Sequence, residues 1–130
     1  MKKLAFVSLV MAILLIFAGC AAEPPIADGT YVAYSVNEDE FVCPYFHIDT
    51  QKMTFMHSAS PLMSFAMFGD IEFEGDKLIA EPKGEDGILV FDIADGNLVY
   101  NAEESTAAPL VWMDSAPVKD GEIFTLAEQY

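Results

Sequence analysis

Two histidines and a nearby carboxylate are the side chains of this chain most suited to binding a metal ion. His47, His57 and Asp49 are of the residue types that zinc prefers. A tight turn near Thr50 is expected to set His47 opposite a residue near Thr54, which leaves His57 several positions away. The three side chains then do not converge. We therefore expect structural or surface histidines and no metal site.

Cys43 is the remaining candidate for a reactive group. A nucleophilic thiol needs a nearby base and electropositive surroundings, but the chain has 21 acidic residues and only 6 basic ones. Cys43 also lies in the apolar segment 41–46, which is typical of a buried core thiol. The sequence has no C-x-x-C, G-x-S-x-G or H-E-x-x-H motif and no phosphate-binding glycine loop. We expect no catalytic residue, no cofactor and no enzyme.

The first twenty residues have the pattern of a secretory signal. A cationic start, residues 1–3, precedes the apolar run 4–17, which is shorter than the roughly 20 residues of a membrane-spanning helix. The run ends in Phe17-Ala18-Gly19-Cys20, which resembles the lipobox of bacterial lipoproteins with Phe17 in place of the usual Leu. The resemblance implies cleavage before Cys20 and a diacylglycerol on its thiol. The alternatives are an uncleaved N-terminal anchor and a plain signal peptide.

This interpretation divides the chain into three parts. Residues 1–19 are the signal peptide, residues 20–27 are the lipidated cysteine with a Pro-containing tether, and residues 28–130 are a single folded domain. Two or more acyl chains give stable membrane anchoring where one chain does not. We expect the domain to be held on the extracytoplasmic face of a bacterial membrane through the lipid on Cys20.

The part after the signal is strongly acidic. Removal of Lys2 and Lys3 takes the formal net charge from −15 to −17, and the chain has no arginine. Nucleic-acid binding is excluded because it depends on Lys and Arg to neutralise phosphates. A cationic protein or peptide is the partner that this charge favours. The alternative is that the acids are only a solvated surface that prevents aggregation. We expect a monomer.

The folded part predicts an all-β domain. Turn dipeptides of Asp and Gly separate short runs rich in Val, Ile, Phe, Tyr and Thr. The spacing predicts a small antiparallel meander barrel, closed or half-open, of about seven or eight strands. The Cys…Trp…Cys pattern of immunoglobulin domains is missing. The expected strands are 30–36, 41–49, 52–58, 68–74, 77–81, 88–93, 97–101 and 122–126, with an irregular excursion over 103–120.

The oxygen-rich segments 92–97 and 84–87 could also be calcium loops. Neither has the ligand spacing of an EF-hand. Because Asp and Gly are also the residues that tight turns require, we interpret both segments as turns.

Several of these strand and turn segments together resemble a known set of domains. The segments are Met53-Thr54-Phe55-Met56, Ser58-Ala59-Ser60, Gly69-Asp70-Ile71-Glu72-Phe73, Asp76-Lys77-Leu78-Ile79, Val90-Phe91-Asp92-Ile93 and Asp95-Gly96-Asn97-Leu98-Val99-Tyr100. Over roughly residues 28–126, the chain looks like small β-rich extracellular domains of Firmicutes. These domains occur as short lipoproteins and as appendages of membrane-embedded zinc peptidases of the antibiotic-sensor type. The resemblance implies the fold and the surface location, and it carries over no functional residue.

Methionine and aromatic residues are concentrated from the third expected strand to the start of the fourth. They are Met53, Phe55, Met56, Met63, Phe65, Met67 and Phe68. Such side chains fill a barrel core and plug its end, or they line a pocket for a hydrophobic ligand or a partner surface. We expect partner contacts through the loop 58–68, with Met63 and Phe65, and through the segment around Trp112.

Three classes of function follow from these patterns. The first is a non-enzymatic module that binds a ligand or a protein. The second is an acidic inhibitor of a basic hydrolase such as lysozyme. The third is a metal-dependent enzyme that uses His47, His57 and nearby acids, which the spacing favours least.

Overall fold

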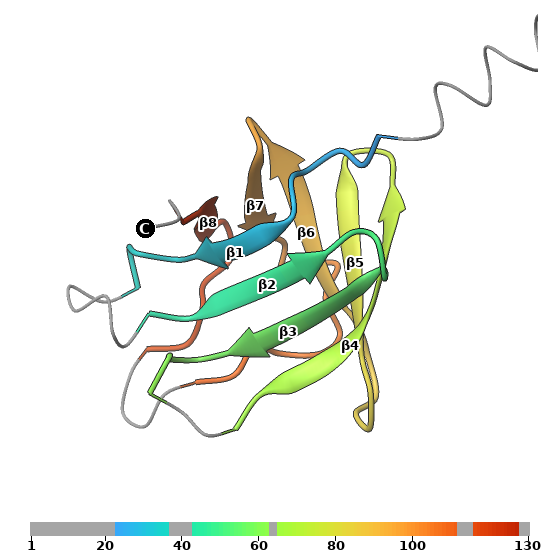
Figure 1. Cartoon of the computed structure of the whole chain (residues 1–130). Helices are drawn as coiled ribbons and strands as arrows, with labels where there is room; N and C mark the ends of the chain where they lie inside the picture. Colours follow the sequence, from blue (N-terminus) through green and yellow to red (C-terminus); the bar gives the residue numbers. More distant parts are fainter. Residues whose placement is uncertain (1–22, 37–42, 63–64, 112–115, 128–130) are drawn as a thin grey trace, which may run out of the picture.

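The computed structural model describes residues 23–36, 43–62, 65–111 and 116–127, and in them eight strands form one closed antiparallel barrel (Figure 1). Each strand pairs with the next one in the chain, and β8 pairs with β1. The strands are β1 Gly29–Val32, β2 Tyr45–Asp49, β3 Thr54–Ser58, β4 Met67–Glu74, β5 Lys77–Pro82, β6 Leu89–Ala94, β7 Asn97–Tyr100 and β8 Ile123–Leu126. The predicted all-β meander barrel is therefore confirmed in its closed form.

The expected signal peptide and the lipidation site lie outside the described residues. Cys20 and the first two residues of the tether precede Glu23, the first residue described. Within the described part of the chain, no helix has both the length and the apolar character to cross a bilayer.

Two of the hairpins have the turns that their dipeptides predict. Asp95 and Gly96 join β6 to β7 with φ angles of 53° and 76°, as a type I′ turn requires. Gly75, with φ of 58°, is the first turn residue between β4 and β5, as in a type II′ turn. The oxygen-rich segment 92–97 is thus explained by hairpin geometry.

The connection between β2 and β3 corrects one prediction. Asp49 pairs with Thr54, so His47 lies opposite Met56, and His57 lies opposite Phe46 rather than several positions away. The cause is the Asp49 side chain, whose Oδ1 accepts hydrogen bonds from the backbone N–H groups of residues 51 and 52, at 3.0 and 3.1 Å. This Asx turn stabilises a four-residue loop where we expected a tighter one.

The barrel interior is filled by aromatic and aliphatic side chains. Phe46 lies at its centre, with ring centroids 4.8 Å from Phe91, 5.4 Å from Phe124 and 6.0 Å from Phe55. An eight-stranded barrel is just wide enough for side chains to fill it. The fully buried Tyr31, Ile48, Leu78, Leu89 and Leu98 complete this core.

Gly69 lets β4 bend closely against its neighbours. A Cβ atom at this position would lie 2.0 Å from the carbonyl oxygen of Glu81 and 2.7 Å from Cε1 of Phe55. Around Gly69, β4 pairs with β3 on one side and with β5 on the other. Glycine inside a strand often marks such a close approach at a barrel bend.

The tether is docked onto one end of the barrel. Ile26 is buried in the core, and the Asp28 carboxylate accepts a hydrogen bond of 2.6 Å from the Thr50 N–H in the turn between β2 and β3. Hydrogen bonds from Thr50 lower the pKa of Asp28. We call this the tether end. β3 starts beside this turn and runs away from it, so Ser58 lies toward the opposite end.

Candidate functional site

The end of the barrel opposite the tether is covered by residues 105–111, which we call the crossing segment. On one side it is held by β6 and the residue before it. The N–H groups of Thr106 and Ala107 donate to the Ile88 carbonyl, at 2.9 and 3.0 Å. The Ser105 hydroxyl accepts the Val90 N–H at 2.9 Å. These hydrogen bonds pair backbone N–H and carbonyl groups at the start of β6, where β6 extends past the end of β7.

From β6 the crossing segment reaches β3, which is not a neighbour of β6 in the barrel. Pro109 is buried, and the side chains of Ala107 and Leu110 pack against the core. The N–H of Leu110 then donates to Nε2 of His57 over 2.8 Å. The segment therefore joins two separated strands across the end of the barrel.

His57 is buried, and both of its ring nitrogens are hydrogen-bonded. Because Nε2 accepts from Leu110, the imidazole is neutral, and its proton is on Nδ1, which donates to the Tyr45 carbonyl at 2.8 Å. The ring stacks on Phe46 with a centroid distance of 4.0 Å and an interplanar angle of 6°. Burial lowers the pKa of His57 to about 4, although the bond to the Tyr45 carbonyl opposes this.

Ser58, the residue after His57, holds the loop between β3 and β4. Its buried hydroxyl lies 2.9 Å from the Ser60 carbonyl and 3.2 Å from the Phe65 carbonyl. The Ser60 hydroxyl in turn accepts the Leu62 N–H at 3.1 Å. Two buried serines thus fix the backbone of a loop that directs Leu62 and Phe65 into solvent.

Four of the large apolar side chains exposed in the described residues lie on the β3 and β4 side of this end, and we call them together the apolar end. They are Leu62, Phe65, Phe68 and Val111, with exposed fractions of 62%, 58%, 57% and 42%. Leu62 and Phe65 lie on the loop held by Ser58, and Val111 follows the residue held by His57. The structure therefore brings together the two segments in which we expected partner contacts. Of the expected contact residues, Phe65 is exposed, and Met63 and Trp112 lie outside the described residues.

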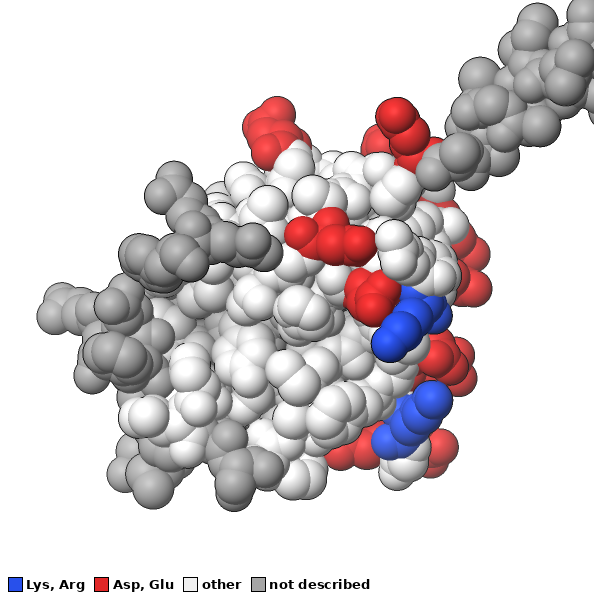
Figure 2. Space-filling view, viewed as in Figure 1, with Lys and Arg blue, Asp and Glu red and all other residues white. Residues whose placement is uncertain are grey.

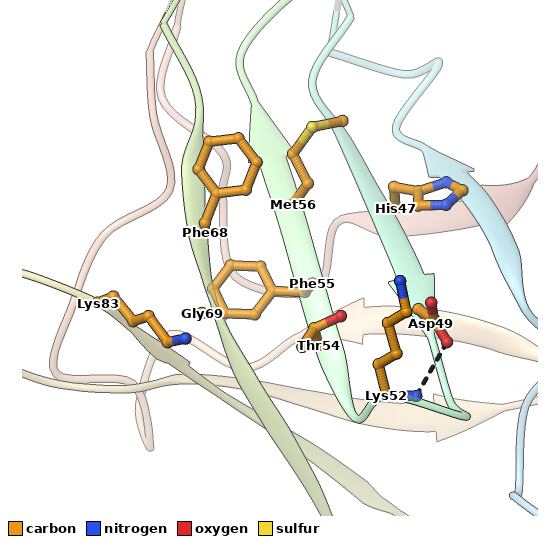
Figure 3. Close-up of a pocket in the computed structure, with 9 residues that line it drawn as sticks. All are labelled: His47, Asp49, Lys52, Thr54, Phe55, Met56, Phe68, Gly69 and Lys83. Carbon is orange, nitrogen blue, oxygen red and sulfur yellow. Dashed lines mark hydrogen bonds between the residues drawn. The ribbon is translucent and has the colours of Figure 1, made fainter.

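A shallow hollow of about 350 Å³ adjoins the apolar end on the outer face of β2, β3 and β4 (Figure 3). Phe68 and Met56, paired across β4 and β3, lie side by side in it. Lys52 and Lys83 stand on opposite sides of the hollow (Figure 3). Phe68 belongs to both the hollow and the apolar end, so the two form one continuous surface.

Charged side chains are unevenly distributed around the barrel. Figure 2 shows acidic residues at the top of the view and along the side of β4 and β5, whereas the surface over β2 and β3 is mostly uncharged. Asp70, Glu72 and Glu74 alternate on the outer face of β4. Nζ of Lys83 lies 3.9 Å from Oδ1 of Asp70, but both side chains are largely in solvent, so this ion pair contributes little to stability.

The sequence-based candidates for chemistry are separated in the structure. His47 is exposed on the outer face of β2, whereas His57 is inside the barrel. Among the described residues, no three His, Cys, Asp or Glu side chains are placed to hold a metal ion. Cys43 is 1% exposed, which confirms the predicted buried thiol.

Sequence reasoning missed two parts of this site. The exposure of Phe68 could have been found, because it shares the outward face of β4 with the three acids at 70, 72 and 74. The role of His57 had no local signal, because its partner Leu110 lies 53 residues further along the chain.

Comparison with known proteins gives no match. No family model matches the chain, and neither a curated protein nor a solved structure does so. The case for a function therefore depends on the geometry of the barrel and its apolar end.

Proposed function

We propose that the chain is a membrane-anchored extracytoplasmic lipoprotein whose barrel is a non-enzymatic binding module for a protein or peptide. The observation that carries the proposal is the apolar end. Leu62, Phe65 and Val111 are exposed on or beside backbone that Ser58 and His57 hold in place, and Phe68 is exposed on β4. Exposed apolar groups on ordered backbone are typical of contact surfaces.

The filled interior directs binding to the outside of the barrel. In barrels that bind a small ligand, the ligand occupies the interior of the barrel. Here Phe46, Phe91 and Phe124 meet in that space with ring centroids less than 6 Å apart. A partner would instead contact the apolar end and the adjacent hollow, where Phe68 links the two.

The position of the tether supports the same use. The tether joins the barrel near Asp28 and Thr50, and β3 extends from there by about 15 Å at the usual rise per residue. A lipid on Cys20 would thus hold the tether end toward the membrane and leave the apolar end facing away from it. A partner in the extracytoplasmic space would reach this end directly.

The charge of the chain favours a basic partner. Interfaces commonly have an apolar centre and a polar rim. The apolar end supplies the centre, and the acids that follow Phe68 on the outer face of β4, together with the net negative charge of the chain, favour a basic protein or peptide. An acidic inhibitor of a basic hydrolase would be a special case of this binding mode.

Matched leucine substitutions test the proposal. Leu62 is in the apolar end, whereas Leu126 is an exposed leucine in β8 that pairs with Tyr31 of β1. The tagged full chain is captured from native cells as the wild type, Leu62→Ser and Leu126→Ser. We expect a partner that the wild type and Leu126→Ser retain and Leu62→Ser loses, with release as salt is raised. Equal capture by all three proteins would contradict the assignment of the apolar end.

The inhibitor alternative has its own measurement. The wild type is added at micromolar concentration and low salt to a basic lysozyme. Inhibition that Leu62→Ser weakens would identify the partner as a hydrolase. Unchanged lysozyme activity would remove this special case and leave the binding module as proposed.

A further inference from the structure

The crossing segment is attached very differently at its two sides. On the β6 side, backbone and hydroxyl groups of Ser105, Thr106 and Ala107 make several hydrogen bonds with Ile88 and Val90. On the β3 side, the bond from the Leu110 N–H to Nε2 of His57 joins it to the barrel. Pro109 and Leu110 also pack against the core on this side, but the hydrogen bond depends on the protonation state of a single imidazole.

The geometry determines which ring nitrogen of His57 would take up a second proton. Nδ1 already carries the proton that is donated to the Tyr45 carbonyl, 2.8 Å away. A proton added to the ring must therefore go to Nε2, which faces the Leu110 N–H at 2.8 Å. Two N–H groups would then point at each other, and the hydrogen bond would become a repulsive contact.

We propose that His57 is an acid-sensitive latch: protonation of Nε2 releases the Leu110 side of the crossing segment, while the β6 side stays attached. Release would move Val111 away from the loop that carries Leu62 and Phe65, and so take the apolar end apart. The latch itself follows from the geometry of the barrel. Its effect on binding rests on the proposed function.

Among the residues that the structure describes, no charged side chain lies against the His57 imidazole. The groups against it are uncharged: the Phe46 ring and Tyr45 carbonyl of β2, Met67 paired on β4, and Leu110. The charged residues of these elements alternate onto the outer faces or lie in solvent; they are His47, Asp49, Asp70, Glu72, Glu74, Glu103 and Glu104. Cys43, buried just before β2, is a neutral thiol at acid pH.

Burial is consequently the main factor that opposes protonation. It lowers the pKa of His57 to about 4. The latch would stay closed at neutral pH and open in a clearly acidic environment. Because the imidazole is stacked on Phe46 in the core, the opening would also loosen the end of the barrel from inside.

Hydrogen exchange of two amides in the crossing segment tests the latch. The full chain is kept in detergent micelles, and protection factors, which correct for the intrinsic pH dependence of exchange, are measured by NMR from pH 7 to 3.5. We expect the protection factor of the Leu110 amide to fall at least tenfold near pH 4. The Ala107 amide, which donates to Ile88, should keep its protection. Unchanged protection of Leu110 would overturn the proposal. So would simultaneous loss at Leu110, Ala107 and the core residue Leu98, since that is global unfolding.

Two substitutions distinguish the role of His57 as a hydrogen-bond acceptor from the role of its stacked ring. His57→Gln places a carbonyl oxygen that does not titrate where Nε2 accepts, so Leu110 should stay protected throughout the pH range. His57→Phe keeps the stacking on Phe46 but removes the acceptor, so Leu110 should be unprotected even at pH 7. Loss of Leu110 protection at the same pH in His57→Gln and in the wild type would overturn the latch. If either variant fails to fold, the comparison of Leu110 with Ala107 in the wild type still decides.

Capture at two pH values separates the latch from the proposed function. The partner should leave the wild type, but not His57→Gln, when the pH is lowered from 7 to 4. If Leu110 is released and capture is unchanged, the latch is correct and the apolar end is not the binding surface. If Leu110 is not released, the latch is wrong whatever capture shows.

Discussion

His57 and Leu110 lie 53 residues apart in the chain, and the 2.8 Å hydrogen bond between them joins β3 to the segment that covers the end of the barrel. The neighbouring Ser58 holds the loop that follows β3. Two consecutive residues therefore position both halves of the apolar end. A substitution at either residue should therefore alter the apolar end, although both side chains are buried beneath it.

Stability should depend on pH through His57. The pKa is about 4 in the folded protein and about 6.5 in the unfolded chain, so the unfolded state takes up the proton first as the pH falls. The stability contribution of neutral His57 is complete above pH 6.5 and is lost as the pH falls to 4. The total loss is roughly 3 kcal/mol of unfolding free energy.

Denaturant titrations of the wild type and His57→Gln between pH 7 and 4 measure this effect. The difference in unfolding free energy between them isolates the imidazole from the many carboxylates, which titrate in both proteins. His47→Gln is the control, because His47 is exposed on the outer face. A wild-type curve parallel to that of His57→Gln would show that His57 does not carry the pH dependence.

Gly69→Ala should destabilise the barrel strongly. Its Cβ would lie 2.0 Å from the Glu81 carbonyl oxygen, so the backbone of β4 or β5 must move. We expect a loss of about 3 kcal/mol or more. Gly75→Ala is the matched control: nothing lies within 4 Å of its Cβ, and only its φ of 58° opposes the change, by about 1 kcal/mol. Thermal unfolding should rank Gly69→Ala well below Gly75→Ala; the reverse order would contradict the close packing of β4 on β5.

Two phenylalanines should separate stability from binding. Phe46→Ala removes the ring at the centre of the core, and we expect a loss of about 3–5 kcal/mol of unfolding free energy. Phe65→Ala removes an exposed ring, so stability should change by less than about 0.5 kcal/mol while partner capture falls. Denaturant titration and capture, measured on both variants, check this. Normal capture by Phe65→Ala would remove Phe65 from the contact surface.

The two cysteines should differ completely in lipidation. We expect Cys20→Ser to abolish incorporation of a labelled fatty acid and to release the chain from the membrane fraction. Cys43→Ser should retain both properties, because this thiol is buried in the barrel. Labelling and fractionation of the two variants side by side measure the effect. Lipid label that persists in Cys20→Ser would contradict the lipobox interpretation.

Local patterns were sufficient to predict the barrel. Asp95-Gly96 and Gly75-Asp76 marked two hairpins because their residue types accept the φ angles that the turns require. The register of β2 on β3 was not predictable in the same way. It depends on the hydrogen bonds of the Asp49 side chain, which lengthen the turn and bring His57 opposite Phe46.

The candidate site was predicted as two segments but not as one surface. The loop 58–68 and the region of Trp112 were identified by composition alone, which does not tell a core side chain from an exposed one. Phe55 and Phe65 illustrate this, because the first is buried in the barrel and the second is in solvent. The link between the segments is a long-range hydrogen bond to a buried imidazole, and a single sequence carries no trace of it.

The pairing of β1 with β8 has a consequence for how the chain folds. Tyr31 pairs with Leu126, so the first strand finds its last neighbour only when nearly the whole domain is available. When the chain becomes available N-terminus first, the edge of β1 that pairs with β8 has no partner until residues 123–126 follow. Ring closure over such a sequence separation is entropically unfavourable and slow. Closure of the barrel is therefore delayed until the last strand is available.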